Sequence, residues 1–143
     1  MSDKFPIEEY NIREAKGDNF YKIMLVNTAL TDYRYKKEFP WSLIIEIDIK
    51  DLTQSFKLPT ESEGIILNLF EDTLTEIIKG KCQCQYVGRV TENGHRNLYY
   101  HIDVPKEVHE ALLEFISTGL NSHEFDYKIS KDEEWNNTSF FYK

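Results

Sequence analysis

The stretch that decides the fold begins with WSLIIEIDI, residues 41–49. Apolar side chains recur there at every second position, as they do in a strand with one buried face. The apolar set consists of Trp41, Leu43, Ile45, Ile47 and Ile49. Ile44, Glu46 and Asp48 take the opposite side, so the pattern predicts a strand with a buried face and an acidic face.

Two helices with recognisable ends follow this strand. Thr60 and Glu63 have the spacing of a capping box, and Pro105 opens a later helical run. Gly80 is predicted to end the first helix in the left-handed conformation, and the second helix is predicted to stop at Gly119. The side chains predicted to be buried are Ile66, Phe70, Leu74, Ile77 and Ile78 in the first helix, and Val108, Ala111, Leu112, Phe115 and Ile116 in the second.

A β-hairpin between the helices turns at residues 92–94, Glu-Asn-Gly. A two-residue Asn-Gly turn would place Leu98 opposite Arg89 and Tyr100 opposite Val87. A three-residue loop would instead pair Tyr86 with Tyr100, Cys84 with Ile102, and Gly88 with Leu98. The second register gathers the apolar side chains on one face, so we expect the longer loop.

The resulting order over residues 42–129 is strand, helix, strand, strand, helix, strand, with a last strand over 124–129. This order predicts an α+β fold, a ferredoxin-like split βαββαβ sandwich with an additional N-terminal β-hairpin. We expect a single domain over residues 1–143. Within it, 1–40 would form the hairpin and a connection, 41–130 the core, and 131–143 a tail packed on the core. Whether the hairpin extends the sheet or covers it stays open.

The composition restricts the classes of function. The formal net charge of −8 disfavours nucleic-acid binding and favours a protein partner with a basic surface. No apolar run is long enough to cross a membrane, and residues 1–5 lack the core of a signal peptide, so we expect a cytoplasmic protein. Cys82 and Cys84, the only cysteines, are expected to be reduced and buried.

Helices on one face of the sheet would leave the other face free as a candidate binding surface. The residues predicted on this face are Ile44, Glu46, Asp48, Gln83, Gln85, Arg89, Tyr99, His101, Asp103, Glu124 and Asp126. Glu46, Asp48, Tyr99, His101 and Asp103 are its candidate binding residues. No phosphate loop, nucleophile elbow or zinc-protease motif is present, so no catalytic residue, cofactor or metal is assigned.

Several short motifs resemble the bacterial domain-of-unknown-function family 695 (DUF695). The residues that carry the resemblance include Pro40, Trp41, Gly88, Gly94, Arg96, Tyr100, Asp132 and Trp135. The resemblance implies no established activity. Some relatives carry a domain similar to regulator of ribonuclease activity B, an acidic inhibitor with a ferredoxin-like fold, which implies a regulatory binding role. Trp135 would either pin the C-terminus to the domain or line a ligand site.

Two hypotheses about function follow. The first is a non-enzymatic binding or regulatory module that acts through protein–protein contacts. The alternative is a small hydrolase or metal-dependent enzyme that uses Glu46, Asp48 and His101 on the free sheet face. This alternative requires the three side chains to converge within hydrogen-bonding reach.

Overall fold

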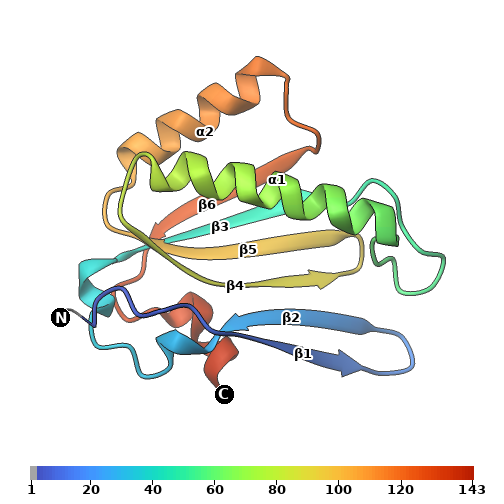
Figure 1. Ribbon diagram of the computed structural model, residues 1–143, viewed down its shortest axis with the longest axis horizontal. Coiled ribbons are helices and arrows are strands. Elements are labelled where there is room, and N and C mark those ends of the chain that lie inside the picture. The colour runs from blue at the N-terminus through green and yellow to red at the C-terminus, as the bar shows by residue number, and fades with distance from the viewer. Residues whose placement is uncertain (1–2) are drawn as a thin grey trace.

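The computed structural model describes residues 3–143; Met1 and Ser2, the start of the predicted region 1–40, lie outside the described residues. The fold is α+β, with one six-stranded antiparallel sheet in the order β1-β2-β4-β5-β3-β6 (Figure 1). Its strands are β1 (Tyr10–Lys16), β2 (Tyr21–Asn27), β3 (Trp41–Asp48), β4 (Cys84–Glu92), β5 (His95–Ile102) and β6 (Phe125–Lys131). The α-helices are α1 (Glu61–Lys79) and α2 (Lys106–Thr118), and the 3-10 helices are η1 (Thr28–Leu30), η2 (Lys36–Glu38) and η3 (Asn136–Tyr142).

The N-terminal hairpin extends the sheet, which answers the question that the sequence left open. β2 pairs antiparallel with β4, with Met24 opposite Val90 and Val26 opposite Gly88. β1 therefore becomes the outermost strand on that side, as Figure 1 shows. Among residues 3–143, no helix is both long and apolar enough to cross a membrane.

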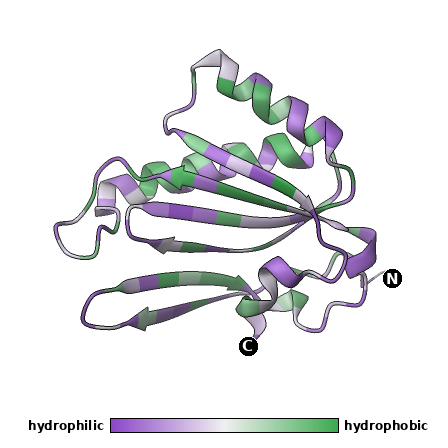
Figure 2. Cartoon of the chain, turned by 180° about the vertical axis from the view of Figure 1, so that it is seen from behind, coloured by the Kyte–Doolittle hydropathy of each residue, from purple (hydrophilic) through white to green (hydrophobic). Residues whose placement is uncertain are grey.

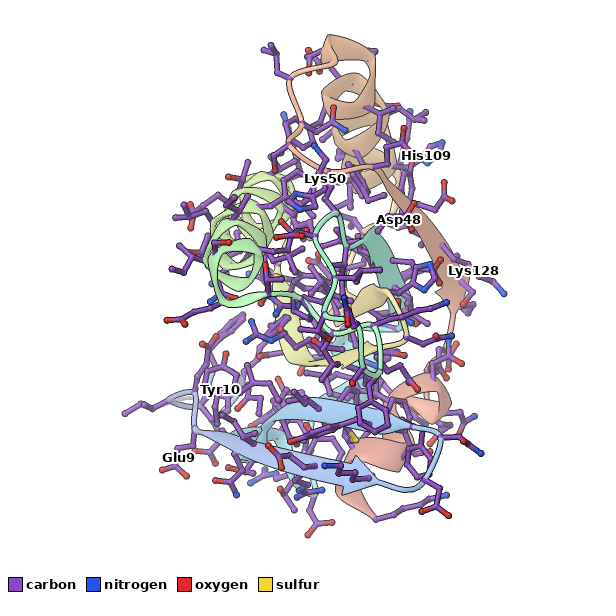
Figure 3. The ribbon with its side chains drawn as sticks, turned by 90° about the vertical axis from the view of Figure 1, so that its right-hand side faces the viewer. Glu9, Tyr10, Asp48, Lys50, His109 and Lys128 are labelled. Carbon is purple, nitrogen blue, oxygen red and sulfur yellow. The ribbon has the colours of Figure 1, made fainter. Side chains whose placement is uncertain are left out.

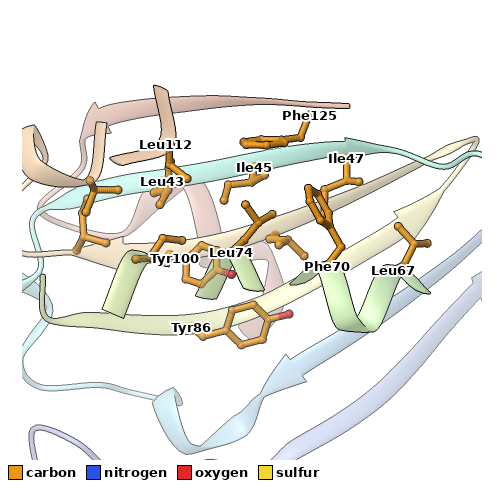
Figure 4. Packing of buried hydrophobic residues seen from close by; sticks show 14 of the residues in the cluster. Leu43, Ile45, Ile47, Leu67, Phe70, Leu74, Tyr86, Tyr100, Leu112 and Phe125 are labelled. Atoms are coloured by element: carbon orange, nitrogen blue, oxygen red, sulfur yellow. The ribbon is translucent and has the colours of Figure 1, made fainter. Parts of the chain in front are cut away.

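α1 and α2 pack against one face of the sheet and form the larger core (Figure 4). Both helices mix hydrophobic and hydrophilic residues, as expected for helices with one buried face (Figure 2). Most predicted core positions are confirmed, but Ile66 and Ile116 are exposed, and Leu67 is buried in place of Ile66. The second helix stops at Gly119 as predicted, with a φ of 68°. Gly80 stays right-handed at φ −71°, so its predicted left-handed conformation is wrong.

The β4–β5 hairpin combines features of both registers that the sequence allowed. Glu92 lies opposite His95, so the turn has two residues and the predicted three-residue loop is wrong. Tyr86 nevertheless faces Tyr100 as predicted, because a β-bulge between Tyr86 and Gly88 shifts the pairing. Arg89 then turns toward the helices and pairs with Glu71 of α1, contrary to the prediction that it lies on the opposite face.

A second core covers part of the sheet face opposite the helices, so the prediction of a wholly free face is wrong. Its buried members are Val26, Leu30, Tyr33, Phe39, Val87, Val90, Trp135 and Phe141. The segments 28–40 and 132–142 supply most of them, and these segments meet although they lie far apart in the sequence (Figure 1). Only the end of this face near β3 and β6 keeps several exposed carboxylates.

Candidate binding surface

His101 is separated from the acidic residues with which the alternative hypothesis, an enzyme, required it to converge. It is fully buried and lies opposite Ser42, whereas Glu46 lies opposite Asn97, four residues further along β3. At about 3.3 Å per residue, that offset corresponds to roughly 13 Å. A cluster of Glu46, Asp48 and His101 is therefore excluded, and His101 is not part of a free surface.

The His101 imidazole belongs to the second core. It stacks on the Trp135 indole with the ring centroids 4.1 Å apart and the planes at 6°. Its Nε2 lies 2.9 Å from Thr138 Oγ1, while Nδ1 is buried without a hydrogen-bond partner among the described residues. Burial lowers the pKa of His101 to about 3, so this side chain is neutral at physiological pH.

Trp135 closes the second core and does not line a cleft. Its indole Nε1 donates hydrogen bonds to the backbone oxygens of Lys36 and Phe39, at 3.1 and 3.0 Å. The Asp132 carboxylate accepts hydrogen bonds from the backbone N–H groups of Asn136 and Asn137, which fixes the turn before η3. Both residues thus hold the C-terminal segment in place.

Three further residues of the family resemblance, Gly88, Gly94 and Pro40, have structural roles in or next to the sheet. A Cβ on Gly88 would lie 2.2 Å from the Leu25 carbonyl oxygen, so only glycine lets β2 approach β4 this closely. Gly94 has a φ of 86° in the hairpin turn, which favours glycine. The backbone oxygen of Pro40 accepts a hydrogen bond from Asp132 N–H at 2.7 Å.

The remaining motif residues lie around the larger core. The Arg96 guanidinium donates to Asn68 Oδ1 at 2.8 Å and lies 3.6 Å from Glu71. Burial lowers the pKa of Arg96 to about 10, which still leaves it charged at neutral pH. Tyr100 is fully buried, and its hydroxyl lies 2.7 Å from Thr75 Oγ1. Trp41 is half-buried and packs on this core, with the Lys131 ammonium over its ring.

Of the other predicted binding residues, Tyr99 and Asp103 are both half-buried. Tyr99 packs edge-on against Phe140 and Phe141, at the border of the second core. Asp103 accepts a hydrogen bond from Gln83 N–H at 3.0 Å, so its carboxylate supports the chain between α1 and β4. These two residues lie outside the exposed acidic region.

The exposed region that remains is named here the acidic surface and consists of Glu46, Asp48, Glu124 and Asp126. Glu46 lies opposite Asp126 on the neighbouring strand, and Asp48 N–H donates to the Glu124 carbonyl oxygen at 3.1 Å. Within residues 3–143, none of these four carboxylates pairs with a lysine or arginine. Asp48 marks this region at the end of β3 in Figure 3.

His95 is the histidine that approaches the acidic surface, and the sequence analysis did not select it. Its Nε2 lies 3.3 Å from Asp48 Oδ1 and 3.9 Å from Glu46 Oε1. One potential metal-ligand atom from each residue lies within 4.8 Å of the others. The predicted fold could have indicated this proximity. Antiparallel pairing of β3 with β5 places His95, the first residue of β5, opposite Asp48, the last residue of β3.

A cleft of about 560 Å³ adjoins the acidic surface beside the loop between α2 and β6. Asp48, Lys50 and Glu124 line it together with residues of that loop, including Ser122 and His123. Ser122 Oγ lies 2.8 Å from His123 Nδ1, and His123 Nε2 lies 3.0 Å from Glu63 Oε2. A hydrogen-bonded chain therefore joins this cleft to the start of α1.

Glu63 anchors this chain of hydrogen bonds. Burial opposes its ionisation, but hydrogen bonds from the backbone of Lys50 and Asp51 and from His123 outweigh that effect, so the pKa of Glu63 is lowered. An ionised Glu63 carboxylate accepts a hydrogen bond from the Nε2–H group of His123. The capping box is half formed, because Thr60 Oγ1 accepts from Glu63 N–H while the Glu63 side chain bonds elsewhere.

Comparison with known proteins gives one family. A sequence model described as a family of unknown function (DUF695) matches residues 12–142. No curated protein and no solved structure matches the chain.

Proposed function

Given that the chain belongs to DUF695, a family of unknown function, we propose that it is a non-enzymatic binding or regulatory module. In this proposal the acidic surface contacts a basic protein surface. We assign the unit of β3 to β6 with α1 and α2 to the ferredoxin-like class, which its strand order β4-β5-β3-β6 supports. The free thiols of Cys82 and Cys84 are compatible with the cytoplasmic location that we propose.

The observation that carries the proposal is the unneutralised charge of the acidic surface. The side chains of Glu46 and Asp48 are 52% and 58% exposed, and His95 is their only ion-pair partner within residues 3–143. Clustered carboxylates repel one another, and a cationic partner relieves that repulsion. Such a surface also raises the rate of association with a basic protein, in a manner that salt weakens.

Charge reversal tests this proposal. Affinity purification from the host with the wild-type chain should recover a basic protein, and Glu46→Lys/Asp48→Lys should lose it. Asp72→Lys/Glu76→Lys makes the same change in charge on the exposed side of α1 and should retain the partner. Recovery that is equal with both double variants, or that does not weaken as salt rises, contradicts the proposal.

A second candidate, a metal-dependent function, rests on the convergence of Glu46, Asp48 and His95. Two carboxylates and an imidazole suit divalent Mn, Fe or Zn. Titration calorimetry with Zn²⁺ and Mn²⁺ should then show one site that His95→Gln removes and His109→Gln retains. Binding that is unchanged in His95→Gln would eliminate this candidate.

A further inference from the structure

β1 presents an open sheet edge. It stands first in the strand order, pairs only with β2 among residues 3–143, and has all seven of its residues exposed. Gly17 N–H donates to Phe20 O, and Thr28 N–H donates to Glu9 O, so the odd-numbered residues of β1 bond to β2. The backbone groups of Tyr10, Ile12, Glu14 and Lys16 consequently point away from β2, toward the open edge.

This edge lacks two of the devices that keep natural edge strands from pairing, namely proline and bulges. It does carry charged side chains at Arg13, Glu14 and Lys16, so a partner strand must match these charges. The β1–β2 register is continuous from Tyr10 to Lys16, without a bulge, and no proline lies within the strand. Ile12, at the middle of the edge, is 70% exposed and lies opposite Leu25.

We propose that two copies of the chain pair through β1, antiparallel and centred on Ile12, to join their sheets. In this register Ile12 lies opposite Ile12 of the second copy, Tyr10 opposite its Glu14, and Glu8 opposite its Lys16. The apolar residues meet at the two-fold axis, and two Glu–Lys pairs flank them. Outward backbone groups meet outward backbone groups throughout, as an antiparallel ladder requires.

The neighbouring registers are less complementary. Moving one strand by two residues in one direction places Ile12 opposite Glu14 and Arg13 opposite Arg13. A further shift places Glu14 opposite Glu14, while a shift in the other direction places Glu8 opposite Glu14. Each of these brings like charges together, which destabilises a cross-strand pair. The last also places Glu9 opposite Arg13, but among the four registers only the one centred on Ile12 has opposite-charge pairs without like-charge pairs.

The molecular mass in solution tests the pairing. Sedimentation of the wild-type chain across a range of concentrations should show a monomer–dimer equilibrium. Ile12→Lys replaces the apolar pair at the axis by two like charges and should raise the dissociation constant by at least about tenfold. Leu120→Lys alters another highly exposed side chain, 84% accessible after α2, and should leave the dimer intact. A wild-type chain that stays monomeric, or a dimer that survives Ile12→Lys, overturns the proposal.

A charge exchange tests the register itself. Glu8→Lys should weaken the dimer about tenfold, and the double variant Glu8→Lys/Lys16→Glu should restore it. An Ile12→Cys variant should form a disulfide between the two copies on oxidation, identified by peptide mapping of the 12–12 link. Failure of the double variant to restore the dimer excludes this register. The test is independent of the proposed function, because Glu46→Lys/Asp48→Lys should leave the monomer–dimer equilibrium unchanged.

Discussion

Gly88 shows how a single position controls the joining of the hairpin to the sheet. The β-bulge at residues 86–88 brings β4 against β2 so closely that the Leu25 carbonyl oxygen occupies the place of a side chain. The Phe141 ring lies on the same side, where an added Cβ would be 2.9 Å from Cε1. Gly88 thus serves both the β2–β4 pairing and the second core.

Gly88→Ala should lower the free energy of unfolding by about 3 kcal/mol, because backbone must move to admit the methyl group. Gly64→Ala is the matched control, since nothing lies within 4 Å of the added Cβ in α1. That control should raise stability by about 0.5–1 kcal/mol through helix propensity. Urea unfolding of the two variants measures both values, and equal effects would contradict the steric account.

His101 should make the stability depend on pH. Its folded pKa of about 3 lies below the ordinary value of 6.5, so the unfolded chain binds more protons between these values. Stability should therefore be lost as pH falls below 6.5, by about 1.4 kcal/mol per pH unit from this group. His101→Gln should flatten the unfolding free energy between pH 7 and pH 5 relative to wild type. His109→Gln, at an exposed position in α2, should keep the wild-type slope.

At the scale of elements, Glu63 connects α1 to two other segments. Its carboxylate accepts from the backbone after β3 and from His123 before β6. One buried side chain in the first turn of α1 therefore fixes the position of the loop that borders the acidic surface.

Glu63→Ala should cost about 3 kcal/mol, because it leaves two backbone N–H groups and the His123 Nε2 proton without partners. Native-state hydrogen exchange should speed up at the amides of Lys50 and Asp51. Glu61→Ala, an exposed acid in the same turn, should change stability by less than about 0.5 kcal/mol. If both variants leave the exchange at Lys50 and Asp51 unchanged, Glu63 does not hold this segment.

Local patterns predicted the elements well, because alternation in residues 41–49 and the caps around Thr60 and Gly119 act over short distances. The bulge at residue 87 could not be predicted, because it depends on how closely β2 approaches β4. For the same reason Arg89 was assigned to the wrong face. Glu63 was recognised as a capping residue, but its partners near residues 50 and 123 follow only from tertiary packing.

For the whole molecule, the important feature is that the sheet has a separate core on each face. Alternation along β5 correctly places His101 opposite the helices, but it cannot reveal that residues 132–142 fold back over it. The second core covers much of the sheet face that the sequence predicted to be free, and the acidic surface is the part left as a candidate binding surface. His95 lies beside this surface because β3 and β5 pair in the register that places His95 opposite Asp48.

Trp135→Ala should remove about 3–5 kcal/mol of stability, since it deletes a buried indole with two hydrogen bonds and a stacked imidazole. The loosened segment should uncover apolar surface of the second core, measurable as increased binding of a hydrophobic dye below the unfolding transition. Phe140→Ala, at a 41% exposed position in η3, is the control and should have a small effect. Comparable losses in both variants would argue against a closing role for Trp135.

The two sides of the second core also differ in when they can form during synthesis on the ribosome. Val26 and Phe39 precede Trp135 and Phe141 in the sequence, so they leave the ribosome first. Until Trp135 and Phe141 have been made, the C-terminal segment cannot cover the apolar side chains of segment 28–40. In the same way, β2 cannot pair with β4 before residues 84–92 have been made. The nascent chain thus exposes apolar surface until residues 135–141 have been made, and chaperones that recognise apolar segments would engage it during that interval.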